Sequence, residues 1–253
     1  MHATTLDQVL TDLRAVTDFA EHRASPIGYF AALYTRMTRA VTRGIHRGFF
    51  DDGPQMERLD VAFANLYVDA ADRHRRGEGG LCAAWRVAFD AAARPGVTLL
   101  QHIYLGMNAH LLVDLPLAVA RTCPLEKLPS LRADFLRINA VVDGEMAAFH
   151  ADLCQASPRL ARLQARTGLL WPTSSSAVLR ISRRVAWARA ARLAGLEGAQ
   201  QGALIERFDG LAARIGAHIA DTKAGFGLAL HALLGEEHED VSKSIRTLRG
   251  RDG

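Results

Sequence analysis

The chain has 253 residues, a formal net charge of +4, 49% hydrophobic residues and 23% charged residues. These values are ordinary for a folded globular protein and leave enough chain for one sizeable core. Cys82, Cys123 and Cys154 lie far apart without metal-ligand spacing, which argues against a disulfide framework and favours a reducing compartment. The N-terminus has no basic segment followed by an apolar run, so we expect no signal peptide and a cytoplasmic protein.

Basic residues are concentrated in one segment, at Arg180, Arg183, Arg184, Arg189 and Arg192. A basic helix of this kind can bind nucleic acid or lipid headgroups, but no aromatic residues are interleaved with it in the manner of RNA-binding modules. We therefore interpret it as a solvated helix face and expect no nucleic-acid partner.

The first third of the sequence predicts four helices, each with an apolar seam at helical spacing. The first begins after Thr4 or Thr5. The other three run from Pro26 to about Arg47, from Pro54 to about Arg75, and from Leu81 to Ala93. The stretches "FFDDGP" and "RRGEGG" separate the later ones, since Asp, Gly and Pro end helices and form turns.

The remaining chain also reads as helices. We expect them over about Val97–Arg121, Leu131–Gln155, Ser174–Leu193 and Gln200–Thr222, with a short one in "AGFGLALHALLG" and a charged, frayed tail from about Glu236. The stretch "ASPRLARLQARTGLLWPTSSS" predicts an extended or partly helical connector.

No convincing run of alternating apolar and polar residues predicts a strand. The sequence therefore predicts an all-α, irregular multi-helix bundle around a central buried helix at about 97–121. Residues 1–155 form the expected core domain with the functional site, and residues 156–253 a C-terminal helical segment packed on it.

The central stretch, "LLQHIYLGMNAHLLVDLPLAVA", is nearly as apolar as a membrane span. A span needs about 20 residues with few polar interruptions, whereas here polar residues fall near the middle and Asp114 would be costly in lipid. Pro116 should also kink it. We expect a helix buried among other helices and no membrane span.

Five polar side chains of this helix divide into two sectors at 100° per residue. His102, His110 and Asp114 share one sector, and Gln101 and Asn108 share another. A buried polar group without a partner costs about 1–3 kcal/mol, so these groups must be partnered, hydrated or bound to a ligand. Gly106 lies between the two histidines and would let a ligand or another helix approach. Both a functional site and a polar packing network fit this pattern.

As a site, the first sector suits acid–base chemistry. His110 and Asp114 are four residues apart, so the carboxylate can orient the imidazole as a general base. His102 is a second acid–base or polar contact, and Asn108 is a positioning residue. The same three residues, His102, His110 and Asp114, could instead hold a divalent metal, although no cofactor is favoured.

Further substrate contacts are expected from polar residues beside the apolar seams of neighbouring helices. They are Asp60 and Tyr67 on the third helix, Asp143 on the helix from Leu131, and Gln101 on the central helix. A metal-dependent version of the site would need Asp60, Asp143 or His150 as additional ligands.

Five blocks in order, "YTRMTRAV", "FDDGPQMERLDVAFANLYVDA", "WRVAFDAA", "LQHIYLGMNAHLLVDL" and "DFLRINAVVD", resemble an uncharacterised, mainly actinobacterial family of helical proteins. The resemblance covers about Ile27 to Asp143 and implies no activity. Family members typically have Asn at the position of Val113, whereas His110 and Asp114 match the family's run.

We therefore expect an enzyme that acts on a small, largely apolar molecule in an interhelical pocket by His/Asp acid–base chemistry, as a cyclase, lyase or hydrolase of secondary metabolism. One alternative is a non-catalytic ligand-binding or interaction protein with a structural polar core. A second is a metal-dependent hydrolase. The expected partner is a small-molecule substrate, and a homo-oligomer is left open.

Overall fold

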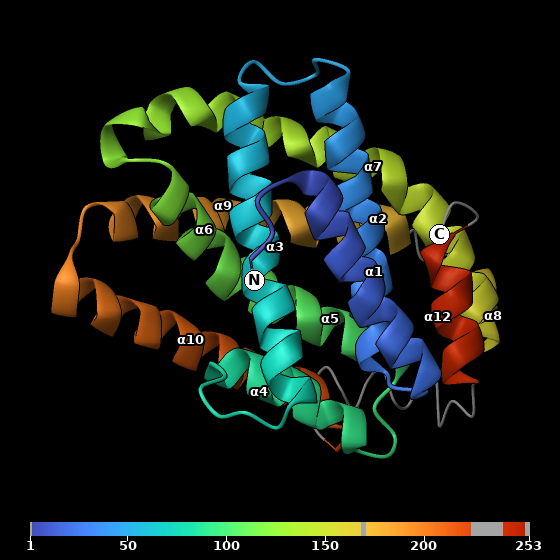
Figure 1. Ribbon diagram of the computed structural model, residues 1–253. Helices are drawn as coiled ribbons and strands as arrows, with labels where there is room; N and C mark the ends of the chain where they lie inside the picture. Colours follow the sequence, from blue (N-terminus) through green and yellow to red (C-terminus); the bar gives the residue numbers. More distant parts are fainter. Residues whose placement is uncertain (1, 168–170, 224–239, 251–253) are drawn as a thin grey trace.

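The computed structural model describes residues 2–167, 171–223 and 240–250, and over these residues it is a bundle of helices without a strand (Figure 1). The predicted fold class is confirmed. The other helices surround a central stretch, Leu99–Thr122, which contacts helices from both halves of the sequence.

The N-terminal helices are α1 (Leu6–His22), α2 (Ile27–His46) and α3 (Gly53–Arg75). The predicted starts of α1 and α3 are confirmed, because the side chain of Thr5 accepts a hydrogen bond from the Gln8 backbone and that of Asp52 from the Gln55 backbone. Pro54 lies in the first turn of α3, where its missing N–H costs nothing.

The central stretch, predicted as one helix, is divided in three. After α4 (Ala83–Asp90) and a 3₁₀ turn (Ala91–Ala93) come α5 (Leu99–Ala109), a π-helical turn (His110–Asp114) and α6 (Leu115–Thr122). In the π turn the Leu115 N–H donates to the His110 carbonyl, five residues back.

Proline accounts for the break. Pro116 has no N–H to offer to the Leu112 carbonyl four residues earlier. That carbonyl accepts instead from Arg189 Nη1 on α9, at 2.5 Å.

The chain continues through a 3₁₀ turn (Leu125–Lys127), α7 (Leu128–Ala156), α8 (Pro158–Thr167), α9 (Trp171–Ala194) and α10 (Gly198–Ala220). The expected connector is thus mostly helical. α8 packs on α7 through the buried Leu160, and α9 begins at Trp171, before the predicted start at Ser174.

The expected frayed tail is wrong for residues 240–249. Asp240 caps α12 (Val241–Arg249), and Ile245 and Leu248 are fully buried where α12 packs on α2 and α7. Figure 1 shows α12 (red) alongside α8 and α7. Burial of an apolar face holds a short charged helix that the charge pattern alone would leave in solvent. The short helix expected in "AGFGLALHALLG" lies outside the described residues.

The C-terminal helices complete the bundle. α9 packs on α6 and α7, and α10 on α4 and α5. Leu99–Thr122 is long and apolar enough to cross a membrane, and 72% of its most apolar window is buried inside the protein. Core helices of soluble proteins meet the same criteria of length and composition.

Candidate functional site

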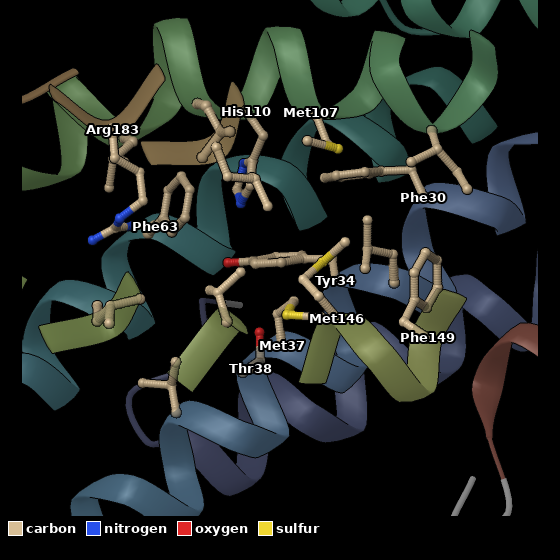
Figure 2. Close-up of a pocket in the computed structure, with 18 of the residues that line it drawn as sticks. Phe30, Tyr34, Met37, Thr38, Phe63, Met107, His110, Met146, Phe149 and Arg183 are labelled. Carbon is tan, nitrogen blue, oxygen red and sulfur yellow. The ribbon is translucent and has the colours of Figure 1, made fainter. Parts of the chain in front are cut away.

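A cavity of about 120 Å³ lies among α2, α3, the central stretch, α7 and α9. Most of its lining is apolar and includes Met37, Met107 and Met146. Figure 2 shows Tyr34 reaching across this space, with His110 directed toward it from the central helix. The polar side chains that also line it are Tyr34, Thr38, Asp60, Tyr104, His110, His150 and Arg183.

His110 is held by a carboxylate at one ring nitrogen. Its Nδ1 lies 2.8 Å from Asp114 Oδ2, and Trp85 Nε1 donates to the same oxygen at 2.9 Å. An indole N–H can only donate, so Oδ2 acts as an acceptor. If Asp114 accepts from both neighbours, the proton of the neutral imidazole lies on Nδ1 and Nε2 carries a lone pair.

The free ring nitrogen is buried beside the cavity. His110 Nε2 has no hydrogen-bond partner among the described residues. The ring stacks on Phe63, with centroids 3.6 Å apart and planes 9° apart, and lies edge-on to Tyr34 at 4.3 Å. Burial lowers the pKa of His110 and raises that of Asp114, while the bond between the two opposes both shifts. The imidazole is therefore neutral at pH 7 and able to accept a proton.

Other unpartnered polar atoms gather around the same space. Seven buried side-chain atoms lack a hydrogen-bond partner among the described residues, and five belong to cavity-lining residues. They are Tyr34 Oη, Thr38 Oγ1, Asp60 Oδ2, His110 Nε2 and Arg183 Nε. Thr38 is close enough to lower the pKa of Tyr34, although the two hydroxyls do not form a hydrogen bond of normal geometry, and burial raises that pKa well above 10. Folded proteins satisfy most buried polar groups, so this concentration makes the cavity the candidate site.

His102 does not join this group. It lies beside a second, much smaller cavity lined by Phe30, Trp85 and Gly106. Phe30 occupies the space next to Gly106, because a Cβ at that glycine would lie 2.2 Å from Phe30 Cγ. Gly106 thus lets α2 approach the central helix. Burial lowers the pKa of His102 to about 4, and its ring hydrogen-bonds the Val97 backbone.

The second polar sector of the central helix binds α10. Gln101 Nε2 donates to the Ile219 carbonyl and Asn108 Nδ2 to the Ala212 carbonyl, each at 2.7 Å. Gln101 also completes a capping box with Thr98. Neither side chain lines the larger cavity.

Of the three remaining sequence candidates, only Asp60 lines the larger cavity. Tyr67 is fully buried behind it, against Phe30 and Trp85. Asp143 lies on an exposed flank of α7, where it accepts a hydrogen bond from Arg180 at 2.7 Å.

The residues present do not form a metal site of the expected kind. No group of three His, Cys, Asp or Glu side chains in the described parts of the chain could hold a metal ion. His110 Nδ1 and Asp114 Oδ2 bind each other, and His102 lies with the smaller cavity.

Four residues of the site were not among the sequence candidates: Tyr34, Thr38, Trp85 and Arg183. Trp85 was expected in the apolar core, and Arg183 on a solvated basic face, yet Arg183 is only 5% exposed. Arg183 differs from the exposed arginines in its position within the helix. It lies four residues after Leu179 and four before Trp187, and both of these pack against the core. That spacing could have identified it as an inward-facing charge.

Comparison with known protein families matches residues 6–222 to a family of unknown function, DUF5995. The match extends beyond the range Ile27–Asp143 expected from the sequence blocks. No curated protein and no solved structure matches the chain. Because the match covers most of the 253 residues, the chain belongs to the family of unknown function DUF5995.

Proposed function

We propose that this protein is an enzyme that binds a small, largely apolar molecule between its helices and transfers a proton to or from it through His110. The observation that carries the proposal is the environment of the imidazole. One nitrogen is fixed by Asp114, and the other is buried, unpartnered among the described residues and beside a cavity. A neutral imidazole held in this way is a general base.

Tyr34 supplies a complementary group. Its hydroxyl has no partner among the described residues, and burial keeps it protonated by raising its pKa. A buried hydroxyl that donates to a developing negative charge on oxygen can stabilise a transition state. Together, His110 as base and Tyr34 as donor fit removal of a proton next to a carbonyl group.

The apolar lining favours some reaction types over others. Most of the side chains that line the cavity are apolar, and His110 and Tyr34 suit proton transfer to and from a substrate without a reacting water molecule. We therefore propose a cyclase or lyase, in which protons move within the substrate, ahead of a hydrolase. We also propose that the protein acts in secondary metabolism in the cytoplasm of an actinobacterium. This proposal includes no membrane span and no nucleic-acid partner.

The test uses simple carbonyl compounds in D₂O. Acetophenone and cyclohexanone carry α-protons that a base can remove and replace with deuterium, and mass spectrometry measures the exchange. We expect exchange above the buffer rate with the wild-type protein, loss of it in His110→Gln, and a fall of about 100-fold or more in Tyr34→Phe. Ligand-observed NMR first establishes that each ketone binds. Bound ketones that exchange equally in wild-type protein and His110→Gln would contradict the proposal.

The same experiment separates a second function, a non-catalytic carrier of small molecules. The four methionines around the cavity, Met37, Met56, Met107 and Met146, favour it, because flexible thioether side chains adapt to varied ligands. A carrier should bind the ketones without exchanging their α-protons, and His110→Gln should leave its affinity for them unchanged.

A further inference from the structure

Two buried, oppositely charged side chains line the cavity without closing on each other. Asp60 comes from α3 and Arg183 from α9, and both side chains are buried. Asp60 Oδ2 and Arg183 Nε have no hydrogen-bond partner among the described residues. The charge of each group affects the pKa of the other, yet no ion pair within 4.0 Å joins the two side chains among the described residues.

Arg183 is poorly compensated for a buried cation. Its Nη2 donates to the Phe135 carbonyl at 2.6 Å, and its guanidinium lies over the Phe135 ring, 4.3 Å from the centroid. Both are neutral partners. A buried guanidinium is normally matched by a carboxylate, which accepts from its planar N–H groups.

We propose that the cavity takes a small monocarboxylic acid, with its carboxyl group between Arg183 and Asp60 and its apolar part among the methionine and phenylalanine side chains. The ligand carboxylate accepts from Arg183 Nε, and Asp60 takes up one proton to donate to it. The negative ligand carboxylate, the neutral Asp60 and the positive Arg183 then have a total charge of zero. This assignment names the substrate class of the proposed enzyme and rests on that function only for the chemistry that follows binding.

Proton uptake makes the binding depend on pH. Burial raises the pKa of Asp60 to about 7, with the positive charge of Arg183 opposing the rise. The other titratable groups at the cavity are Tyr34 on α2, Tyr104 on α5, His110 on the π turn and His150 on α7. The pKa of Tyr34 is raised and those of both histidines are lowered by burial, so all three stay neutral above pH 7. Arg183, with its pKa lowered by burial to about 10, stays charged to well above pH 8.

The test compares matched acids and alcohols by isothermal titration calorimetry. Benzoate is paired with benzyl alcohol, and hexanoate with 1-hexanol, at pH 6.5 and 8.5; a dry cavity of about 150 Å³ is known to hold a benzene ring. We expect the acid of at least one pair to bind at least tenfold more tightly than its alcohol at pH 6.5. Its affinity should fall about tenfold per pH unit above 7, while alcohol binding stays constant.

Variants identify the groups responsible. Asp60→Asn, an uncharged mimic of the protonated acid, should retain the acid preference and lose its pH dependence. Arg183→Met should lose the preference but still bind the alcohol, whereas Arg189→Met, on the same helix but outside this cavity, should keep it. Where Arg183→Met does not fold, Arg183→Lys keeps the charge without the planar fork and should weaken the preference.

Equal binding of acid and alcohol, or unchanged acid binding in Arg183→Met, would overturn the proposal, as would failure of both acids to bind. The result is independent of catalysis, because His110→Gln should keep the acid preference. An acid preference without ketone exchange would contradict only the proposed enzyme, and ketone exchange without an acid preference would contradict only the substrate class.

Discussion

At the scale of single residues, the position of the proton on His110 depends on Trp85, a side chain that does not line the larger cavity. Trp85 donates to Asp114 Oδ2, which in turn faces His110 Nδ1. Since the indole cannot accept, it favours the arrangement in which Asp114 is a pure acceptor. Trp85 is therefore a positioning residue for the proposed base, His110.

Trp85→Phe should shift the proton of His110. Without the indole donor, burial favours an Asp114 that takes up one proton from solvent and donates it to Nδ1; the imidazole's own proton then lies on Nε2, which can no longer act as the proposed base. Long-range ¹H–¹⁵N NMR should show bare Nε2 in the wild-type protein and a mixture of tautomers in the variant. The free energy of unfolding should fall by about 1–3 kcal/mol.

Trp187→Phe is the control, since this tryptophan packs on Phe135 instead. It should leave the His110 spectrum unchanged. A protonated Nε2 in the wild-type protein would show that the assigned tautomer, and the role of Trp85, are wrong.

The sequence predicted that His110 and Asp114 would lie next to each other, and it named Asp60 but not Tyr34 or Arg183. His110 and Asp114 could be found because four-residue spacing on a helix brings side chains together without knowledge of the fold. Tyr34 and Arg183 reach the cavity from α2 and α9, so finding them depends on helix packing that local periodicity does not specify. Gln101 and Asn108 shared a sector as predicted, but only the fold shows that the sector faces α10.

At the scale of secondary-structure elements, α2 and α5 cross at Gly106. A Cβ there would lie 2.2 to 2.7 Å from atoms of Phe30, whose ring also lies against Tyr34 and His110. The glycine thus sets the distance between α2 and the central stretch that carries His110.

Gly106→Ala should destabilise the protein by about 1–3 kcal/mol, because overpacking outweighs the better helix propensity of alanine. Gly144→Ala on α7 is the matched control, since a Cβ added there would meet nothing within 4 Å in the described structure. That variant should gain about 0.5–1 kcal/mol. Urea denaturation measures both, and equal effects of the two substitutions would contradict close packing at Gly106.

The π turn and α9 are linked through one carbonyl group. Arg189 donates to the Leu112 carbonyl, whose usual partner in an α-helix would be the N–H that Pro116 lacks. Arg189→Met should leave this carbonyl unpaired, at a cost of about 1–3 kcal/mol. In a Pro116→Ala background the same substitution should cost less, because the introduced alanine provides an N–H.

A double-mutant cycle by chemical denaturation measures this coupling. Additive effects of Arg189→Met and Pro116→Ala would show that the two groups do not compete for the carbonyl. The sequence predicted a single helix with a kink at Pro116, because the apolar period continues through the π turn and only the backbone hydrogen bonds change register.

At the scale of the whole molecule, contacts between helices distant in sequence were harder to predict than the positions of the helices. Caps and breakers such as Thr5, Asp52 and "FFDDGP" act locally, so the N-terminal helices could be located closely. α12 could not, because its stability comes from Ile245 and Leu248 packing against α2 and α7, more than 80 residues earlier in the chain.

Stability as a function of pH is also a property of the whole molecule, because buried acids and buried histidines act in opposite directions. Asp60 has its pKa raised from 3.8 to about 7, so between these values the folded state binds more protons and stability falls as pH rises. His102 has its pKa lowered from 6.5 to about 4, so over that interval the unfolded state binds more protons and stability rises with pH. The slopes of Asp60 and His102 therefore nearly cancel between about pH 4 and 6.5.

Substitution of Asp60 or His102 alone should reveal how each group changes the free energy of unfolding with pH. Relative to wild type, the free energy of unfolding of Asp60→Asn should rise by about 1.4 kcal/mol per pH unit between about pH 4 and 6.5, because the opposing acid is gone. His102→Gln should show the opposite slope over the same interval. Urea titrations at half-unit steps of pH measure both differences, each against the wild-type curve at the same pH. Parallel curves for wild type and Asp60→Asn would mean that Asp60 ionises normally in the folded protein, and the acid that is expected to share its proton with a bound carboxylate would then be absent from the cavity.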